Sequence, residues 1–175
     1  MDLLLDFDPT AELYFQKEDS VEVQQLIQQA GSSYADGDAE LPLLKAFFHA
    51  PDSLNVLVAL NRFYYYQHRL SEALLTSEKA LKIIASNIDF PTDWQQIDGD
   101  AITSAPKDQL TWIRLYLFTL KSIGFLKMRL HDLDTSKQIF EKLNGLDQEN
   151  RIGASGLLDI VNRKINENNN IYNLG

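Results

Sequence analysis

The stretch LNVLVALNRFYYYQHRLSEALLTSEKALKI, residues 54–83, decides the fold class of this chain. Large apolar residues in its first half recur at spacings of three and four, at Leu54, Leu57, Leu60 and Tyr64. That spacing places them on one face of an α-helix. The pattern starts again at Leu70, directly after His68 and Arg69. We therefore predict two helices joined by a short turn rather than one long helix.

A second copy of this pattern occupies residues 117–146, 63 positions further along the chain. Six of the thirty aligned positions are identical, and the apolar positions also correspond. His68 and His131 match each other, just before the predicted turn between the paired helices. The chain therefore contains an internal repeat of a two-helix unit.

Residues that begin and end helices support this division. Asp52 and Ser53 are good N-cap candidates for the first helix of the earlier copy. Ser71 and Asp134 are the matching candidates for the second helices of the two copies. Gly145 is predicted to end the last of these helices, because glycine often follows a helix C-terminus.

The segment RLSEALLTSEKALKI resembles the second helix of a tetratricopeptide repeat. Its small residues Ala73 and Ala80 lie seven apart, where that family places its alanines. In the later copy, Gly124 and Phe140 match the family's signature glycine and second-helix aromatic residue. Three residues of the first helix also match its packing positions: Leu57, Leu60 and Tyr64. The resemblance implies an all-α fold in which antiparallel helix pairs stack into an α-solenoid.

Extended along the chain, the family's repeat of about 34 residues implies a single domain, residues 1–175, with about three units. These units are residues 20–53, 54–87 and 117–150. An apolar stripe in residues 151–168 predicts a capping helix over the open end of the stack. Residues 169–175 are rich in asparagine and are expected to form a frayed tail.

Residues 88–116 interrupt the repeat frame. We expect a loop there with one helical turn around Asp93–Ile97, anchored by Phe90 and Trp94. Such a long loop is either functional or a packed connector, and the sequence favours neither. After Lys107, a helix should run through into the unit at 117–150. Near the N-terminus, a short helix or arm is expected over residues 9–18, with contacts from Leu13, Tyr14 and Phe15.

Composition narrows the class of protein. With 175 residues and 45% apolar residues, the chain can bury a sizeable core. The absence of cysteine excludes disulfides, thiolate metal sites and cysteine nucleophiles. A formal net charge of −9 argues against general nucleic-acid binding. There is no usual secretory signal and no apolar run of the roughly 20 residues that a membrane span needs. We therefore expect a cytoplasmic protein that does not enter a membrane.

Charge is spread unevenly along the chain. Residues 1–50 contain ten acidic residues and two lysines, whereas residues 106–131 contain five basic residues and one aspartate. Two interpretations remain open. The two segments are differently solvated faces of one protein, or the second is a basic surface that attracts an acidic partner segment.

Residue patterns typical of catalysis or metal binding are missing from the sequence. His49, His68 and His131 show no metal-binding spacing, and we expect structural roles for them. The segments DGDAE and DGDAI do not complete a calcium loop, and GASG does not form a nucleophile elbow. No pair of carboxylates stands in a recognisable acid–base context. We therefore predict no catalytic residues, no metal and no cofactor, and an enzyme is the minority interpretation.

The resemblance implies where a partner would bind. In tetratricopeptide-repeat proteins the first helices of successive units line a concave groove. Carried over, the candidate groove residues are Asn55, Val58, Ala59, Arg62, Tyr65, Tyr66, Phe118, Lys121, Ser122, Phe125, Met128 and Arg129. The run RFYYYQHR, residues 62–69, stands out because its aromatic residues cannot all face the core of one helix. Lys121 alone fits the lysine and asparagine pattern that clamps a partner's C-terminal carboxylate, so no such clamp is predicted.

These features predict a module that binds a protein or peptide, as an adaptor or assembly factor. The favoured partner-binding residues are Asn55, Arg62, Tyr65, Tyr66, Phe118, Lys121, Phe125, Met128 and Arg129. A dedicated chaperone for a bacterial secretion client is an alternative by analogy of fold. The run LVALNRFYYYQHRLSEAL also resembles small bacterial repeat proteins encoded beside nitrogen-fixation genes, which would imply an accessory role in maturing a metalloenzyme. Formation of a homodimer is a further possibility, and the sequence does not identify the partner.

Overall fold

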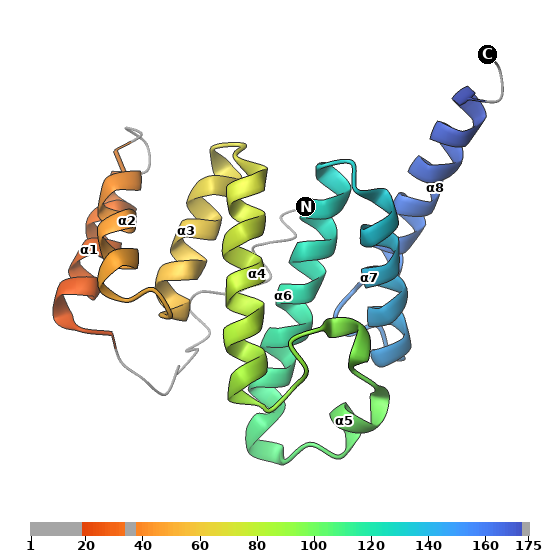
Figure 1. Cartoon of the computed structure of the whole chain (residues 1–175), viewed down its shortest axis with the longest axis horizontal. Helices are drawn as coiled ribbons and strands as arrows, with labels where there is room; N and C mark the ends of the chain where they lie inside the picture. The colour runs from red at the N-terminus through yellow and green to blue at the C-terminus, as the bar shows by residue number, and fades with distance from the viewer. Residues whose placement is uncertain (1–18, 34–37, 173–175) are drawn as a thin grey trace. The chain divides into compact units, whose positions relative to one another are not determined.

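The computed structural model of the protein describes residues 19–33 and 38–172, and all regular secondary structure in these ranges is helical (Figure 1). Eight α-helices and two short 3-10 helices follow one another there without a strand. The predicted all-α class is confirmed. The chain divides into two units, residues 1–83 and 84–175, and the boundary falls inside helix α4 (Leu70–Asn87).

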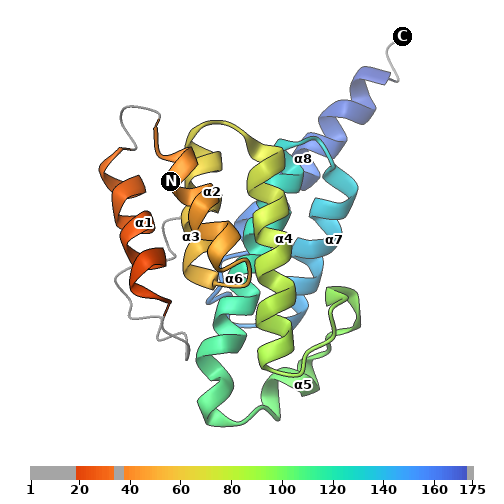
Figure 2. The ribbon, with the colours of Figure 1, turned by 60° about the vertical axis from the view of Figure 1, so that its left-hand side comes forward.

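The first unit contains α1 (Val21–Ser32), α2 (Glu40–His49), α3 (Leu54–Tyr66) and most of α4. Helix α2 packs against both α1 and α3, and the three lie side by side in two views (Figures 1 and 2). The hydroxyl groups of Ser20 and Ser53 accept hydrogen bonds from the first turns of α1 and α3, as N-caps do. Apolar side chains from the three helices fill the space between them, among them Val23, Ala30, Leu43, Ala46, Val56 and Leu57.

The second unit begins within α4 and continues through η1 (Trp94–Gln96), α5 (Gly99–Thr103) and η2 (Lys107–Gln109). It ends with three longer helices, α6 (Leu110–Arg129), α7 (Leu133–Leu146) and α8 (Ser155–Tyr172). Helix α7 packs between α6 and α8 (Figure 1). The helix predicted after Lys107 was expected to run into the predicted repeat at residues 117–150. The 20 residues of α6 confirm this prediction.

The turns after α3 and α6 have the same backbone geometry. His68 has a φ of 57° and His131 a φ of 65°, which is the left-handed region. The next N–H group in each turn reaches back over the helix end, from Arg69 to the Tyr64 carbonyl at 2.8 Å and from Asp132 to the Lys127 carbonyl at 2.9 Å. These are the bonds of a Schellman motif. The two histidines therefore have the structural role at a helix C-terminus that their matching positions predict.

Residues 88–116 are more ordered than the sequence suggests. The predicted helical turn is confirmed as η1, but α5 and η2 were not expected. Lys142 on α7 donates to the Gln95 carbonyl at 2.8 Å, which fixes η1 beside that helix. Phe90 packs edge-to-face on the ring of Tyr116, as expected of an anchor. The deepest anchor is Ile97, which is buried, whereas Trp94 is only half-buried.

Several predicted helix boundaries are wrong. The side chain of Asp132, not Asp134, caps α7, and Ser71 lies inside α4. Gly145 is the last residue but one of α7 rather than a residue beyond its end. The capping helix begins and ends later than expected, so residues 169–172 of the predicted tail are helical. The arm expected over residues 9–18 lies outside the described residues.

Within the described parts of the chain, no helix is both long enough and apolar enough to pass through a bilayer.

Candidate binding surfaces

Helix α3 separates its aromatic residues between the core and the surface. Phe63 and Tyr64 turn inward and are buried, as their positions on the helix predict. Tyr66 keeps 45% of its surface exposed, and Tyr65 is half-buried. The rings of Tyr65 and Tyr66 meet edge-to-face with their centroids 5.6 Å apart. The two tyrosines thus form an aromatic edge on the solvent side of α3.

The other two predicted residues of α3 lie on the same side of the helix. Arg62 is half-buried and, among the residues that the structure describes, has no Asp or Glu within ion-pairing distance. Asn55 is exposed, but its amide donates to the carboxylate of Asp19 at 2.8 Å. Arg62 and the tyrosine pair therefore form the part of this face best suited to a partner.

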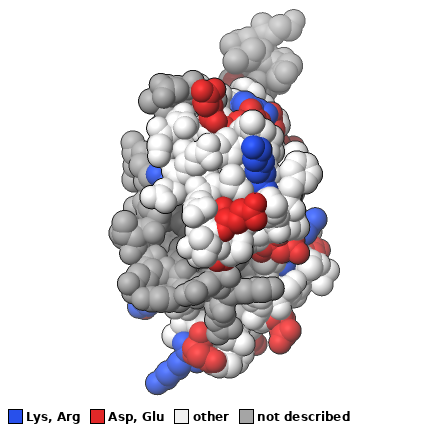
Figure 3. Space-filling view, turned by 90° about the vertical axis from the view of Figure 1, so that its left-hand side faces the viewer, with Lys and Arg blue, Asp and Glu red and all other residues white. Residues whose placement is uncertain are grey.

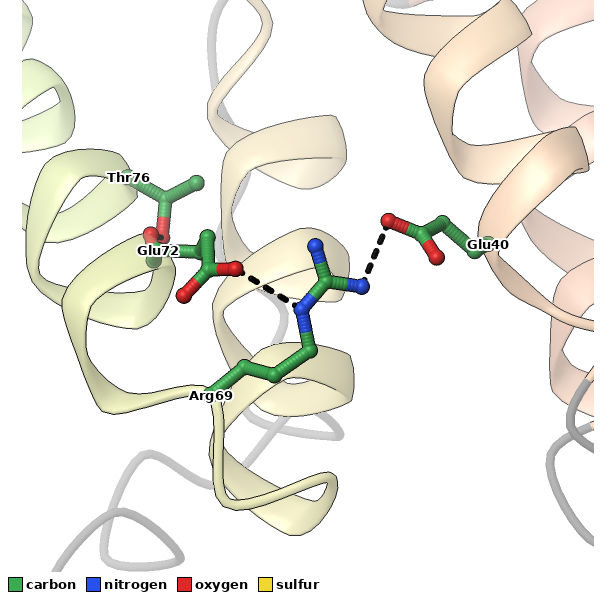
Figure 4. Close-up of polar contacts among 4 residues, drawn as sticks. All are labelled: Glu40, Arg69, Glu72 and Thr76. Atoms are coloured by element: carbon green, nitrogen blue, oxygen red, sulfur yellow. Dashed lines mark hydrogen bonds and ion pairs between the residues drawn. The ribbon is translucent and has the colours of Figure 1, made fainter.

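At the C-terminal end of α3, Arg69 joins the neighbouring helices of the first unit (Figure 4). Its Nη1 donates to Glu40 of α2 at 2.7 Å, and its Nε donates to Glu72 of α4 at 2.8 Å. The guanidinium also stacks over the ring of Tyr64, 4.6 Å from its centroid. Burial, together with the charge of Glu40, raises the pKa of Tyr64 above its ordinary value.

This network has no signal in the sequence, because Glu40 lies 29 positions before Arg69. Its charged groups are about one-third exposed, so water screens them strongly. We interpret the network as a clamp that positions α2 and α4 around the end of α3.

Helix α6 carries the second predicted surface. Phe118 and Phe125 are both half-buried and lie on one side of the helix. Arg129 is exposed, and its guanidinium lies 5.9 Å from the centroid of the Phe125 ring. Arg114 is exposed one turn before Phe118. Arg114 was not among the predicted surface residues, because it precedes the predicted repeat at residues 117–150.

Two of the predicted groove residues are not on the surface. Lys121 is only 3% exposed, and its Nζ donates to the carbonyl oxygen of Ile152 at 2.8 Å. The same Nζ lies 4.9 Å from the centroid of the Phe118 ring. Met128 is 5% exposed. Both belong to the flanks of the α6 face, where the side chains turn towards the protein interior, so a partner cannot reach them as predicted.

Each of the two surfaces presents aromatic rings and a guanidinium group on one side of its helix. In residues 19–33 and 38–172, no three His, Asp or Glu side chains gather closely enough to hold a metal ion. Because α3 belongs to the first unit and α6 to the second, each surface is complete within its own unit.

The first unit also exposes large apolar side chains that were not among the predicted surface residues. Phe48 is 82% exposed, and the others of this kind are Val21, Leu41 and Leu75. His49 approaches Glu22 at 3.4 Å, which brings the end of α2 to the start of α1. Viewed from this end, the molecule shows uncharged areas that separate a few acidic and basic groups (Figure 3).

Comparison with known proteins identifies a relative of similar length. The chain is 40% identical over 158 residues to the "Uncharacterized 19.8 kDa protein in nifW 5'region" of Azotobacter chroococcum mcd 1. The matched region covers 90% of this chain and 88% of the relative. No family model matches the chain, and no solved structure matches it.

Proposed function

Since this chain belongs to the same family as the uncharacterised 19.8 kDa protein of the nifW 5′ region, we propose a function that this family would share. The protein is a protein-interaction module, an adaptor or assembly factor that holds a segment of a partner protein. Its binding surfaces are the exposed faces of α3 and α6, the first helices of two tetratricopeptide-like helix pairs. The partner is a protein or peptide, and the module uses no cofactor and catalyses no reaction.

One observation carries this proposal. On α3 and α6, aromatic and arginine side chains remain at the surface although both helices bury many large apolar residues. Tyr66 is 45% exposed and Phe125 is half-buried, with Arg129 lying over the Phe125 ring. Aromatic and arginine residues are enriched in protein interfaces, because they bury a large area and keep a polar group for hydrogen bonding.

The repeat architecture is part of the same proposal. The pairs α3–α4 and α6–α7 each close through a histidine with positive φ, at positions 63 residues apart. Each turn also has the same backbone hydrogen bonds. Equal turns orient the second helix of each pair similarly against the first. This agreement supports a tandem of related helix pairs, as in tetratricopeptide-repeat proteins.

Affinity purification of the full chain from its native host, followed by mass spectrometry, tests the proposal. We expect a specific partner protein to copurify. Replacing Tyr65, Tyr66 or Arg129 by alanine should weaken its recovery, by about tenfold for a side chain worth about 1.4 kcal/mol. Arg163→Ala on α8 is the matched control, because it removes an exposed arginine from a different helix. Undiminished recovery with all three alanine variants would rule out these surfaces.

A second candidate function is favoured by the name of the relative. That name places the relative in the 5′ region of nifW, which favours an accessory protein or dedicated chaperone for a nitrogen-fixation metalloenzyme. In a nitrogen-fixing host, deleting the gene should slow growth on dinitrogen and leave growth on ammonium unchanged. Co-expression should also raise the yield of soluble client. Equal growth of the deletion strain on both nitrogen sources would argue against this role.

The proposal also covers location and assembly. We place the protein in the cytoplasm, where a bacterial adaptor would meet its client.

A homodimer would change which surfaces are available, because one face of each copy would be occupied. Analytical ultracentrifugation over a range of concentrations would distinguish a monomer from a dimer, and a fluorescent fusion would locate the protein in the cell.

A further inference from the structure

We propose that the exposed stripe of α6 binds an acidic, amphipathic peptide segment of the partner. This inference rests on the proposed function and names the chemistry of the segment that the module recognises. The α6 stripe is defined here as Thr111, Arg114, Phe118, Ser122, Phe125 and Arg129.

The stripe is one continuous face of a long helix. At about 100° per residue, its six members lie within roughly 40° of a common line along α6. Leu115 on one flank and Met128 on the other are both buried, so the stripe itself points away from the core of the unit. Between Arg114 and Arg129 the helix rises by about 22 Å. A helical segment of about 15 residues would span this length. An extended segment would span it with fewer residues.

Among the described residues, no carboxylate pairs with the two arginines of the stripe. Helix α6 contains no Asp or Glu, although the whole chain has 25 acidic and 16 basic residues. Within the described parts of the chain, neither Arg114 nor Arg129 has a carboxylate within ion-pairing distance. The nearby basic residues differ: Lys127 pairs with Asp132 at 3.4 Å, and Lys121 is buried against the Ile152 carbonyl. The two arginines are therefore the cations that remain for an external carboxylate.

The centre of the stripe is apolar. Phe118 and Phe125 are two helical turns apart, about 10 Å along the axis, and both keep part of their rings at the surface. An amphipathic segment with two apolar anchors at that spacing would cover both rings, as helices do in apolar grooves. Carboxylates near its ends would then meet Arg114 and Arg129. This arrangement identifies an acidic segment with apolar anchors, not merely a negatively charged one.

A nucleic acid fits the stripe less well. Its two arginines stand at opposite ends of an apolar centre, whereas a phosphate backbone presents charges at short, regular intervals. The net charge of −9 would also repel it. A second copy of this chain is a different occupant, and the following experiment separates it from a foreign peptide.

The test is a selection of random peptides of about 16 residues, displayed on phage, on the full-length protein. We expect the wild type to enrich peptides rich in Asp and Glu that carry apolar residues three, four or seven apart. The variant R114E/R129E should recover these peptides about tenfold less. The control variant R163E/K164E changes the net charge equally, at exposed sites on α8, and should recover them like the wild type. Circular dichroism checks that both variants keep their helices.

Three results would overturn the inference. They are no enrichment above an uncoated surface, enrichment of neutral or basic peptides, and equal recovery by R114E/R129E and the wild type. Concentration-dependent dimerisation that R114E/R129E abolishes would assign the stripe to a second copy and also overturn it. The two hypotheses fail in different ways. If a native partner copurifies equally with R114E/R129E and with the wild type, the proposed function stands and the acidic segment on the α6 stripe is wrong. If no native partner copurifies at all, the proposed function itself is wrong.

Discussion

Gly124 on α6 and Phe140 on α7 lie so close together that a Cβ on Gly124 would stand 2.8 Å from Cε1 of the Phe140 ring. Phe140 is completely buried, and the Gly124 carbonyl accepts a hydrogen bond from Ser136 at 2.8 Å. The missing side chain lets the two helices approach, and the ring fills the space. This contact holds the pair α6–α7 together behind the α6 stripe.

Gly124→Ala should therefore destabilise the protein. The ring of Phe140 and the side chain of Ile139, 2.9 Å from the added Cβ, would both have to move. Overpacking of this kind costs about 1–3 kcal/mol, which outweighs the roughly 0.5–1 kcal/mol that alanine contributes in a helix. Urea unfolding followed by circular dichroism measures the difference in free energy of unfolding.

Gly145→Ala is the matched control, because Gly145 lies in α7 with no atom within 4 Å of an added Cβ. It should leave stability unchanged or raise it by up to about 1 kcal/mol. If Gly124→Ala behaved like Gly145→Ala, α6 and α7 would not be packed as closely as described.

The helix pairs could be predicted because apolar spacing and turn residues in residues 54–83 and 117–146 indicate the same structure. The exact boundaries could not. Asp132 and Asp134 are both good N-cap residues, and only the fold decides which one precedes the first helical turn. Gly145 was wrongly predicted to end its helix, because glycine is tolerated inside an exposed helix as well as beyond its end.

The candidate surfaces were predicted in part for a similar reason. Periodicity fixes which residues of α6 share a side, and so it identified Phe118, Phe125 and Arg129. It does not say how wide the exposed side is. The burial of Lys121 depends on the backbone of Ile152, 31 positions away, which α8 and the preceding loop bring beside α6.

The turn at His131 gives a second prediction. A residue with a φ of 65° is strained unless it is glycine, and histidine tolerates this conformation better than a β-branched residue does. His131→Val should destabilise the protein by about 1–2 kcal/mol, whereas His131→Gly should keep or slightly raise its stability. The order glycine, histidine, valine in urea midpoints is the result to check. A valine variant as stable as the wild type would contradict the left-handed turn.

Lowering the pH should reduce the stability of the first unit through protonation of Glu72. The hydrogen bond from Arg69 lowers the pKa of Glu72 below its ordinary value of 4.5. A lowered pKa in the folded state means that the contribution to stability is present above pH 4.5 and is lost as the pH falls through the lower, folded value. Glu72→Gln should remove this part of the pH dependence and be less stable than the wild type at neutral pH.

The measurement for Glu72 is urea unfolding at neutral pH and at several values below pH 4.5. Asp159→Asn is the control, since Asp159 is exposed on α8 and has no ion pair among the described residues. It should retain the acid response of the wild type. An equal difference between Glu72→Gln and the wild type at every pH would show that the Arg69 bond does not act through the ionisation of Glu72.

Tyr116 on α6 gives the last prediction, because its hydroxyl is fully buried and has no hydrogen-bond partner among the described residues. Burial, and to a smaller extent the charge of Asp93, raises the pKa of this tyrosine. Removing an unpaired buried hydroxyl removes a desolvation cost of about 1–3 kcal/mol, so Tyr116→Phe should stabilise the protein in urea unfolding. Tyr64→Phe should have the opposite effect, because it removes a hydrogen bond with Glu40. Above about pH 10 the stabilisation by Tyr116→Phe should grow, since only the wild type can release the Tyr116 proton on unfolding. A less stable Tyr116→Phe would show that the hydroxyl has a partner in solution.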